Sequence, residues 1–120
     1  MVTRKRELEP LLPLTPAMFH VLVALADGEK HGYAILKEVS ELTGGRVRLS
    51  AGTLYGIIKR LLQEEMIVES GRRPAAALDD ERRRYYRLTE FGERVARAET
   101  ARLQDMVAMA RTKNLRPETA

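Results

Sequence analysis

Residues 50–65, SAGTLYGIIKRLLQEE, decide the fold of this chain because they separate into two distinct faces of a helix. Ser50 belongs to a residue type that caps helices, so a helix is predicted from there to about Glu65. At the helical step of about 100° per residue, apolar and polar residues occupy opposite arcs. The apolar arc is the predicted core face and consists of Leu54, Ile57, Ile58, Leu61 and Leu62. The outer arc consists of Gly52, Thr53, Tyr55, Gly56, Lys59, Arg60 and Gln63.

The outer arc combines hydrogen-bond donors, an aromatic ring and two cations. This combination is typical of a helix that lies in the major groove of duplex DNA. Lys59 and Arg60 would also be ordinary surface residues near a helix end, but they share their arc with Thr53 and Tyr55. We therefore predict that these four side chains contact DNA.

Gly52 and Gly56 lie one turn apart on the outer arc. Each glycine costs a helix roughly 1 kcal/mol relative to alanine. One interpretation is that the two glycines leave a bare strip along which the backbone approaches DNA closely. The alternative is that Gly52 relaxes the start of the helix and that Gly56 packs against a neighbouring helix.

Two helices are predicted before this one. The first starts at the capping pair Thr15-Pro16 and stops near residues 27–28. The second runs from about Gly32 to Thr43, and the glycine pair at 44–45 ends it. Residues 46–49 alternate basic with apolar side chains, which indicates a short extended piece.

After residue 65, two strands are predicted at 67–70 and 84–88, joined by a long loop. Thr89 then caps a last helix over residues 90–112. Three helices followed by a two-stranded wing predict a mainly α fold with a small β-hairpin. This fold class is a winged helix-turn-helix followed by a long C-terminal helix.

This order divides the chain into four parts. Residues 1–14 are predicted to form an N-terminal arm or short helix, and residues 15–88 the winged helix-turn-helix DNA-binding domain. Residues 89–113 are the predicted dimerisation helix, and residues 114–120 a frayed tail.

The predicted wing brings basic residues together at its base. Because strands of a hairpin pair, five arginines at the two ends of the loop would form one cluster, which suits phosphate contact. These residues are Arg72, Arg73, Arg82, Arg83 and Arg84. The alternative is a self-paired, solvated loop, since residues 79–81 are acidic.

The last helix carries two apolar groups that are rotated relative to each other. Phe91, Val95 and Ala98 fit a face that packs on the chain's own domain. A second group is rotated by about 110° and is predicted to form a homodimer interface: Leu103, Met106, Val107 and Ala110. The alternative is a bent helix that stays on one monomer. A ligand cavity in the dimer could be lined by Leu103, Met106 and Met109, which are as compatible with simple dimer packing.

Composition argues against several other classes of protein. The 120 residues contain no cysteine, which excludes disulfides and thiolate metal sites, and carry a net charge of +4. The two histidines, His20 and His31, lack the partners of a metal or nucleophile site, so no enzyme, metal or cofactor is expected. His20 is predicted at the core edge and His31 at the start of the second helix. No apolar run is long enough to cross a bilayer and no signal-peptide core follows Met1, so a cytoplasmic protein is expected.

Through three motifs, the sequence resembles the PadR family of bacterial regulators. They are His31-Gly32-Tyr33, the run SAGTLY at 50–55, and the run YYRLTEFG at 85–92. The resemblance covers roughly residues 14–110, and the single terminal helix is similar to the shorter PadR subfamily. It implies a homodimeric repressor that binds double-stranded DNA and is released by an aromatic or drug-like small molecule. It also implies that Tyr33, Ser50, Thr53 and Tyr55 lie at or near the DNA surface.

The chain departs from the family pattern in three places. Gly56 stands where the family often has proline, the wing is longer than usual, and no tryptophan is present to stack a flat ligand. A protein-binding winged-helix module is the rival hypothesis, since a fold does not fix its function. Such a module should carry an apolar or acidic face on its third helix, whereas this chain carries a polar and basic one.

Overall fold

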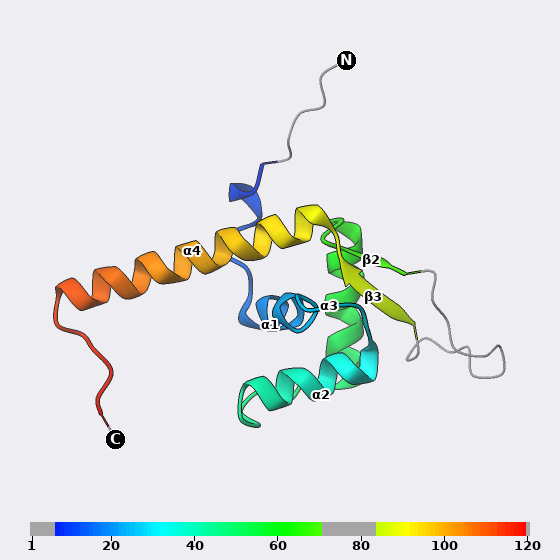
Figure 1. Cartoon of the computed structure of the whole chain (residues 1–120), viewed down its shortest axis with the longest axis horizontal. Helices are drawn as coiled ribbons and strands as arrows, with labels where there is room; N and C mark the ends of the chain where they lie inside the picture. Colours follow the sequence, from blue (N-terminus) through cyan, green and yellow to red (C-terminus); the bar gives the residue numbers. More distant parts are fainter. Residues whose placement is uncertain (1–6, 71–83, 120) are drawn as a thin grey trace, which may run out of the picture.

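A computed structural model describes residues 7–70 and 84–119 of the chain. Within these residues it contains one short 3-10 helix, four α-helices and three strands (Figure 1). In chain order they are η1 (Glu9–Leu11), α1 (Pro16–Ala24), β1 (Lys30–His31), α2 (Gly32–Leu42), α3 (Ala51–Gln63), β2 (Ile67–Glu69), β3 (Tyr85–Leu88) and α4 (Glu90–Thr112). The predicted mainly α winged-helix class with a long C-terminal helix is confirmed.

Side chains cap the N-termini of all four α-helices described. The hydroxyls of Thr15, Ser50 and Thr89 each accept the backbone N–H three residues further on. His31 does the same for α2 through its Nδ1, which accepts the N–H of Ala34 at 3.2 Å. These bonds satisfy N–H groups that the first helical turn leaves without an intrahelical partner. The predicted starting points of α1, α3 and α4 are therefore confirmed.

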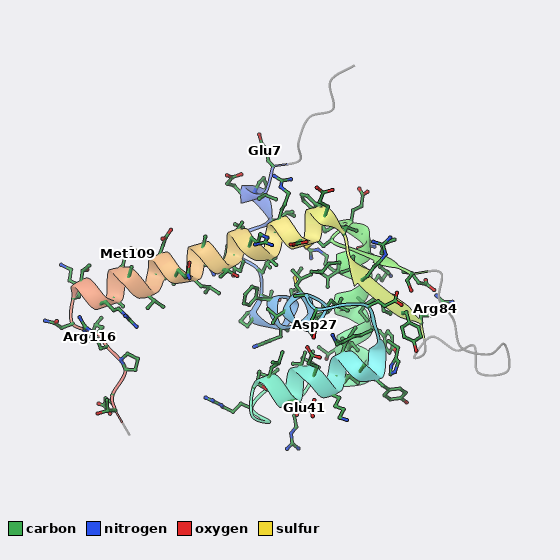
Figure 2. The ribbon with its side chains drawn as sticks, viewed as in Figure 1. Glu7, Asp27, Glu41, Arg84, Met109 and Arg116 are labelled. Atoms are coloured by element: carbon green, nitrogen blue, oxygen red, sulfur yellow. The ribbon has the colours of Figure 1, made fainter. Side chains whose placement is uncertain are left out.

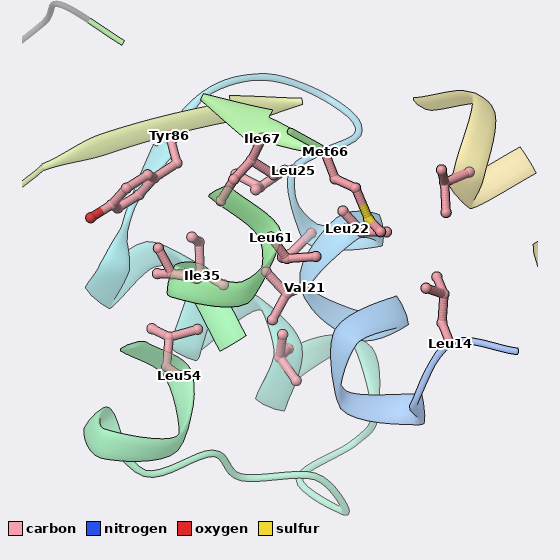
Figure 3. Close-up of a cluster of buried hydrophobic side chains, with 14 residues drawn as sticks. Leu14, Val21, Leu22, Leu25, Ile35, Leu54, Leu61, Met66, Ile67 and Tyr86 are labelled. Atoms are coloured by element: carbon pink, nitrogen blue, oxygen red, sulfur yellow. The ribbon is translucent and has the colours of Figure 1, made fainter. Parts of the chain in front are cut away.

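The core lies where α1, α2 and α3 meet the sheet and the first half of α4 (Figure 3). Its fully buried side chains include Leu22 of α1, Ile35 of α2 and Leu54 of α3. Met66, Ile67 and Tyr86 close the side that faces the sheet, and Leu14 contributes from the segment before α1. Burying this many aliphatic side chains is the main stabilising contribution to the domain.

The sheet differs from the predicted two-stranded hairpin. Its strand order is β1-β3-β2, with both pairs antiparallel, so β1 adds a third strand on the far side of β3. Lys30 pairs with Tyr86 and His31 with Tyr85. Strand β1 has no alternating pattern because it contains only two residues, and its partner strand lies far along the chain.

Two helix ends also differ from expectation. The first helix ends at Ala24 rather than near residues 27–28. Beyond it the backbone N–H groups of Leu25, Ala26 and Gly28 bond the carbonyl three residues earlier, which is the pattern of turns and not of an α-helix. The third helix ends at Gln63, two residues before the predicted end, and Glu65 takes a left-handed conformation with φ of 60°.

Helix α4 crosses the domain on the side opposite α2 and continues well past α1 without bending back (Figure 1). Its first half packs on the core through Val95, with Phe91 half-buried beside it. After Glu99 no described residue of the chain is buried. In the described part of the chain, no helix combines the length and apolar character needed to span a membrane.

Candidate nucleic-acid interface

Helix α3 presents the two faces that its sequence predicts. Leu54, Ile58 and Leu61 are buried, with Ile57 and Leu62 half-buried beside them. The outer arc is exposed at Gly52, Thr53, Gly56, Lys59, Arg60 and Gln63, and Tyr55 is half-buried. The polar face of α3 is therefore turned away from the core and available to a partner.

The N-terminal end of α3 carries two hydroxyl groups in contact. Ser50 Oγ accepts the backbone N–H of Thr53 at 3.1 Å and lies 3.0 Å from Thr53 Oγ1. Ser50 is committed to capping by this arrangement. Since Thr53 Oγ1 accepts the hydrogen of Ser50, the hydrogen of Thr53 can still be donated outward. Of these two predicted DNA contacts, Thr53 is the one that keeps a hydroxyl hydrogen to donate.

Lys59 and Arg84 lie on the border of one hollow, although they come from different elements. This hollow of about 290 Å³ lies between α3 and β3, with Tyr55 and Tyr86 also in its lining. Arg84 is the last residue before β3 and is partly balanced by Glu69, whose Oε1 lies 3.7 Å from its Nε. Figure 2 shows Arg84 at the end of the molecule opposite to Met109 of α4. The structure thus brings one predicted wing cation beside the predicted reading helix.

Arg60 faces a different neighbour from Lys59. It lines a hollow of about 210 Å³ that residues 10–15 of the N-terminal segment share with Met18, Glu64 and Met66. The two cations therefore lie on different flanks of α3, although the sequence analysis grouped them in one arc. Neither forms an ion pair with a residue that the structure describes.

Tyr33 lies at the start of α2, with 46% of its surface exposed. The ring of His31 contacts Tyr33 and Tyr85 edge to face, at centroid distances of 6.5 and 5.5 Å. Because the Nδ1 of His31 also caps α2, this histidine fixes the entry of the helix and orients Tyr33. The predicted role of His31 at the start of the second helix is confirmed, and His20 is half-buried at the core edge as predicted.

Gly52 and Gly56 both face open space. A Cβ atom added at either position would meet nothing within 4 Å among the described residues. The packing alternative for Gly56 is therefore wrong within the part of the chain that the structure describes. The structure thus contains the bare strip on the exposed face of α3. The close approach of DNA along this strip remains a prediction.

Four of the five predicted wing arginines lie outside the described residues. These are Arg72, Arg73, Arg82 and Arg83. Among the described residues, no group of three or more histidine, aspartate or glutamate side chains could hold a metal ion.

A buried carboxylate beneath the N-terminal segment was not predicted. Glu99 of α4 is only 2% exposed, and its oxygens accept two bonds from Arg102, from Nε at 2.7 Å and Nη2 at 2.8 Å. The hydrogen bonds from Arg102, its positive charge and a backbone hydrogen bond from Leu14 together hold the pKa of Glu99 below its usual value against the cost of burial. A glutamate three residues before an arginine is a common surface pair, so the sequence carried no sign that this one is buried.

A second ion network holds the start of β1. Lys30 contacts Asp27 and also lies 3.4 Å from Glu38 of α2. Burial lowers the pKa of Lys30. The hydrogen bond to Asp27 and the charges of both carboxylates raise it by more than burial lowers it, so the pKa lies above its usual value. This network fixes the turn that leads into Tyr33.

A family model described as the transcriptional regulator PadR-like family matches residues 21–98. The chain belongs to this family. The matched range of the PadR-like protein includes α2, α3, both strands of the hairpin and residues 90–98 of α4. It therefore contains the whole exposed face of α3.

Solved structures share the fold of this PadR-like protein. A transcriptional regulator from Clostridium thermocellum is 22% identical with a TM-score of 0.66, covering 79% of this chain and 86% of that one. A PadR family regulator from Clostridium difficile R20291 gives the same identity and TM-score, covering 79% and 94%. Bacillus subtilis PadR, solved in complex with operator DNA, is 24% identical with a TM-score of 0.59, covering 70% and 47%.

One curated relative is similar in sequence to the PadR-like protein. It is an uncharacterized 37.1 kDa protein in transposon TN4556 of Streptomyces fradiae, 42% identical over 60 residues. The match spans 48% of this chain and 17% of that protein.

Proposed function

We propose that this PadR-like protein binds duplex DNA through the exposed face of α3 and acts as a dimeric transcriptional repressor. The observation that carries the proposal is the division of α3 into a buried apolar face and an exposed face with a hydroxyl, a ring and two cations. An α-helix of this kind fits the major groove of B-DNA. The fold is shared with Bacillus subtilis PadR, which was solved in complex with operator DNA, and this supports duplex DNA as the partner.

The side chains divide between reading bases and holding phosphates. Thr53 and Tyr55 lie in the first turns of α3, where a helix in the groove reaches base edges. Lys59, Arg60 and Arg84 carry charge toward the phosphates, which position a protein without specifying sequence. Ser50 caps α3 and Tyr33 lies exposed at the start of α2. The proposal includes both of these residues and the arginines of the wing.

Homodimerisation is proposed from the second half of α4. Three large apolar side chains there are about half exposed or more: Met106 at 48%, Val107 at 52% and Met109 at 62%. Leu103 and Ala110 continue the same stripe and are partly covered. An isolated helix end with this much apolar surface is marginal in water. A second copy of α4 covers it by symmetry, and two copies of α3 then address two half-sites.

The proposed dimer surface extends onto α1, which was not predicted from the sequence. A hollow of about 260 Å³ lies between α1 and α4, lined by Phe19 and Val23 among others. A second hollow of about 490 Å³ shares Phe19 and Thr100 with the first and continues along α4 past Leu103 and Val107. Together they form one groove along α1 and α4, in which apolar side chains are joined by Glu93, Arg97 and Arg111. The proposal places the partner's α4 in this groove.

Release of DNA by a small aromatic or drug-like effector is also proposed, from one hollow on the proposed dimer surface. The larger hollow at Leu103 lies on the proposed dimer surface and has the volume of a small-molecule site. Met106 and Met109 are exposed on α4 and would approach a ligand there only when the dimer forms. A ligand that reshapes this interface would change the spacing of the two reading helices.

The test compares a double variant of α3 with a charge-matched control. Lys59→Gln with Arg60→Gln removes two cations from α3, and Lys113→Gln with Arg116→Gln removes two exposed cations from the tail. Affinity for a duplex from the chain's own upstream region and for a scrambled duplex is measured at two salt concentrations. We expect the α3 variant to lose at least about tenfold in affinity and to show a shallower salt dependence, with the tail variant unchanged. Equal affinity and salt dependence in all three proteins would favour the protein-binding alternative.

A further inference from the structure

The turn between α2 and α3, residues 43–49, displays two arginines whose direction is set by their neighbours. Val47 and Leu49 are half-buried and pack against the core, whereas Arg46 and Arg48 are exposed. Alternate side chains of an extended piece point in opposite directions, so anchoring Val47 and Leu49 inward turns both arginines outward. The basic and apolar alternation in the sequence thus corresponds to a surface pair of cations.

The backbone of this turn is held by hydrogen bonds at both ends. Thr43 Oγ1 donates to the carbonyl of Val39 at 2.8 Å and accepts the N–H of Val47 at 3.0 Å. The N–H of Gly45 bonds the carbonyl of Ser40 at 2.8 Å, which closes the end of α2. Gly44 and Gly45 both have left-handed φ values, of 60° and 79°, and allow this tight closure.

The Arg48 guanidinium lies over the bare backbone of the turn. Its Nη2 is 3.5 Å from the position that a Cβ would occupy on Gly45. The Arg48 guanidinium therefore lies close to the backbone of Gly45 at the end of α2.

Both guanidinium groups keep their charge for an outside partner. Neither forms an ion pair or hydrogen bond with a side chain that the structure describes. By contrast, Arg97 and Arg102 of α4 are each paired with a carboxylate three or four residues away. Unpaired arginines are suited to phosphate because their planar fork donates two parallel hydrogen bonds.

The turn is also in the right place to meet a DNA backbone. It leads directly into Ser50, the cap of α3, so Arg48 precedes that cap by two residues. When the N-terminal turns of a helix lie in the major groove, the chain that enters the helix passes a phosphate strand at the groove's edge. Cations at that point meet phosphates and not base edges.

We propose that Arg46 and Arg48 form a phosphate clamp that holds one DNA strand beside the N-terminus of α3. The inference rests on the proposed DNA-binding function and assigns to it two residues outside the reading helix and the wing. The clamp binds phosphate oxygens of the duplex backbone and is indifferent to base sequence. It fixes how deeply α3 sits in the groove by anchoring the segment just before it.

The experiment measures salt dependence on two duplexes. Arg46→Gln with Arg48→Gln is compared with the tail control Lys113→Gln with Arg116→Gln, which removes the same charge. Binding to a cognate and a scrambled duplex is followed across a range of salt concentrations, with circular dichroism checking the helix content. We expect the slope of log affinity against log salt to become shallower by about 0.9 for each phosphate that the variant no longer neutralises, with affinity falling equally on both duplexes. Replacing both arginines by lysine should restore most of the slope.

Each alternative result has a distinct meaning. A slope and affinity equal to those of the tail control would overturn the clamp while leaving DNA binding by α3 intact. A reduction confined to the cognate duplex would also overturn it, because that pattern indicates base contact. If the unmodified protein binds neither duplex, the proposed function itself fails and the clamp with it. If the double variant loses helix content, the single variant Arg46→Gln keeps the position of Arg48 over Gly45 and gives the same test with half the effect.

Discussion

Gly92 shows how one missing side chain fixes the position of a whole helix. A Cβ added there would lie 1.9 Å from the carbonyl oxygen of Met66 and 2.7 Å from its carbonyl carbon. The neighbouring Thr89 donates its hydroxyl to the carbonyl of Glu65 at 2.6 Å and its N–H to that of Met66 at 3.0 Å. The first turn of α4 is thus pressed against the turn that ends α3.

We predict that Gly92→Ala lowers the free energy of unfolding by about 3 kcal/mol or more, because the obstacle is backbone and cannot rotate away. Urea denaturation followed by circular dichroism measures the change. Ala98→Gly on the same helix provides a comparison for ordinary helix propensity and should cost only about 1 kcal/mol. A Gly92→Ala protein as stable as the unmodified one would show that α4 does not approach Met66 this closely.

Gly56 has the opposite surroundings, since its Cβ would enter open space among the described residues. We predict that Gly56→Ala raises the free energy of unfolding by up to about 1 kcal/mol through helix propensity. The same variant should bind DNA more weakly, because a methyl group would occupy the bare strip of α3. Denaturation and duplex titration on the same preparation check both parts. Higher stability with unchanged DNA affinity would leave the strip without a role in binding.

Residues whose partners are close along the chain could be predicted from the sequence. The caps at Thr15, Ser50 and Thr89 bond groups three residues away, so their local pattern was sufficient. The constraint on Gly92 comes from Met66, in a different part of the chain, and leaves no trace in the local pattern. The motif at residues 85–92 included this glycine without revealing why it is needed.

At the scale of elements, Glu99 connects α4 to the N-terminal segment. Its carboxylate accepts bonds from Arg102, and a backbone hydrogen bond from Leu14 further stabilises the charged form. The folded protein therefore holds the carboxylate ionised, with a pKa below the usual value. Its contribution to stability is fully present above the ordinary glutamate pKa of about 4.3 and is lost as pH falls through the lower pKa of the folded state.

We predict that Glu99→Gln lowers the free energy of unfolding at neutral pH by about 1–3 kcal/mol, because a buried charge-assisted hydrogen-bond pair is removed. The difference between the two proteins should shrink as pH falls below about 4. Urea denaturation at a series of pH values measures this convergence. Glu93→Gln, which removes an exposed partner of Arg97, is the control and should change stability by less than about 0.5 kcal/mol. A constant difference between Glu99→Gln and the unmodified protein down to a pH of about 3 would contradict the assignment.

Elements with a sequence pattern of their own were predicted well, including strands β2 and β3 to within one residue. The bounds 90–112 of α4 match the structure because a capping threonine and a sustained helical pattern define them. Strand β1 was missed because two residues carry no pattern of their own. The sequence analysis grouped Lys59 and Arg60 in one arc, although consecutive residues of a helix point about 100° apart. The N-terminal segment that borders Arg60 could not be placed from the wheel.

For the whole molecule, the proposed surfaces for DNA contact and self-association lie at opposite ends. Arg84 and Met109 mark these ends in Figure 2. The order of elements and the two rotated apolar groups on α4 are the sequence features from which the two surfaces are proposed. The groove formed by Phe19 and Val23 could not be predicted, because it exists only once α1 and α4 are packed together.

We predict that Val107→Asp converts the protein to a monomer, because it puts a charge in the centre of the exposed apolar stripe of α4. Sedimentation velocity measures the state of association. Ala101→Asp is the matched control, since Ala101 is exposed and lies about 120° around the helix from Val107. Unchanged association of Val107→Asp at micromolar concentration would contradict dimerisation through this surface.

Dimeric binding means that two copies of α3 read two half-sites of duplex DNA. The most direct test is repeated selection of duplexes from a random pool by the unmodified protein, followed by sequencing. We predict enrichment of an inverted repeat whose half-sites are separated by about 10 base pairs or a multiple of that spacing. We also expect Thr53→Ala to relax the selected sequence at matching positions of both half-sites. A pool that shows no enriched sequence after several rounds, with protein that remains folded, would contradict sequence-specific reading by paired α3 helices.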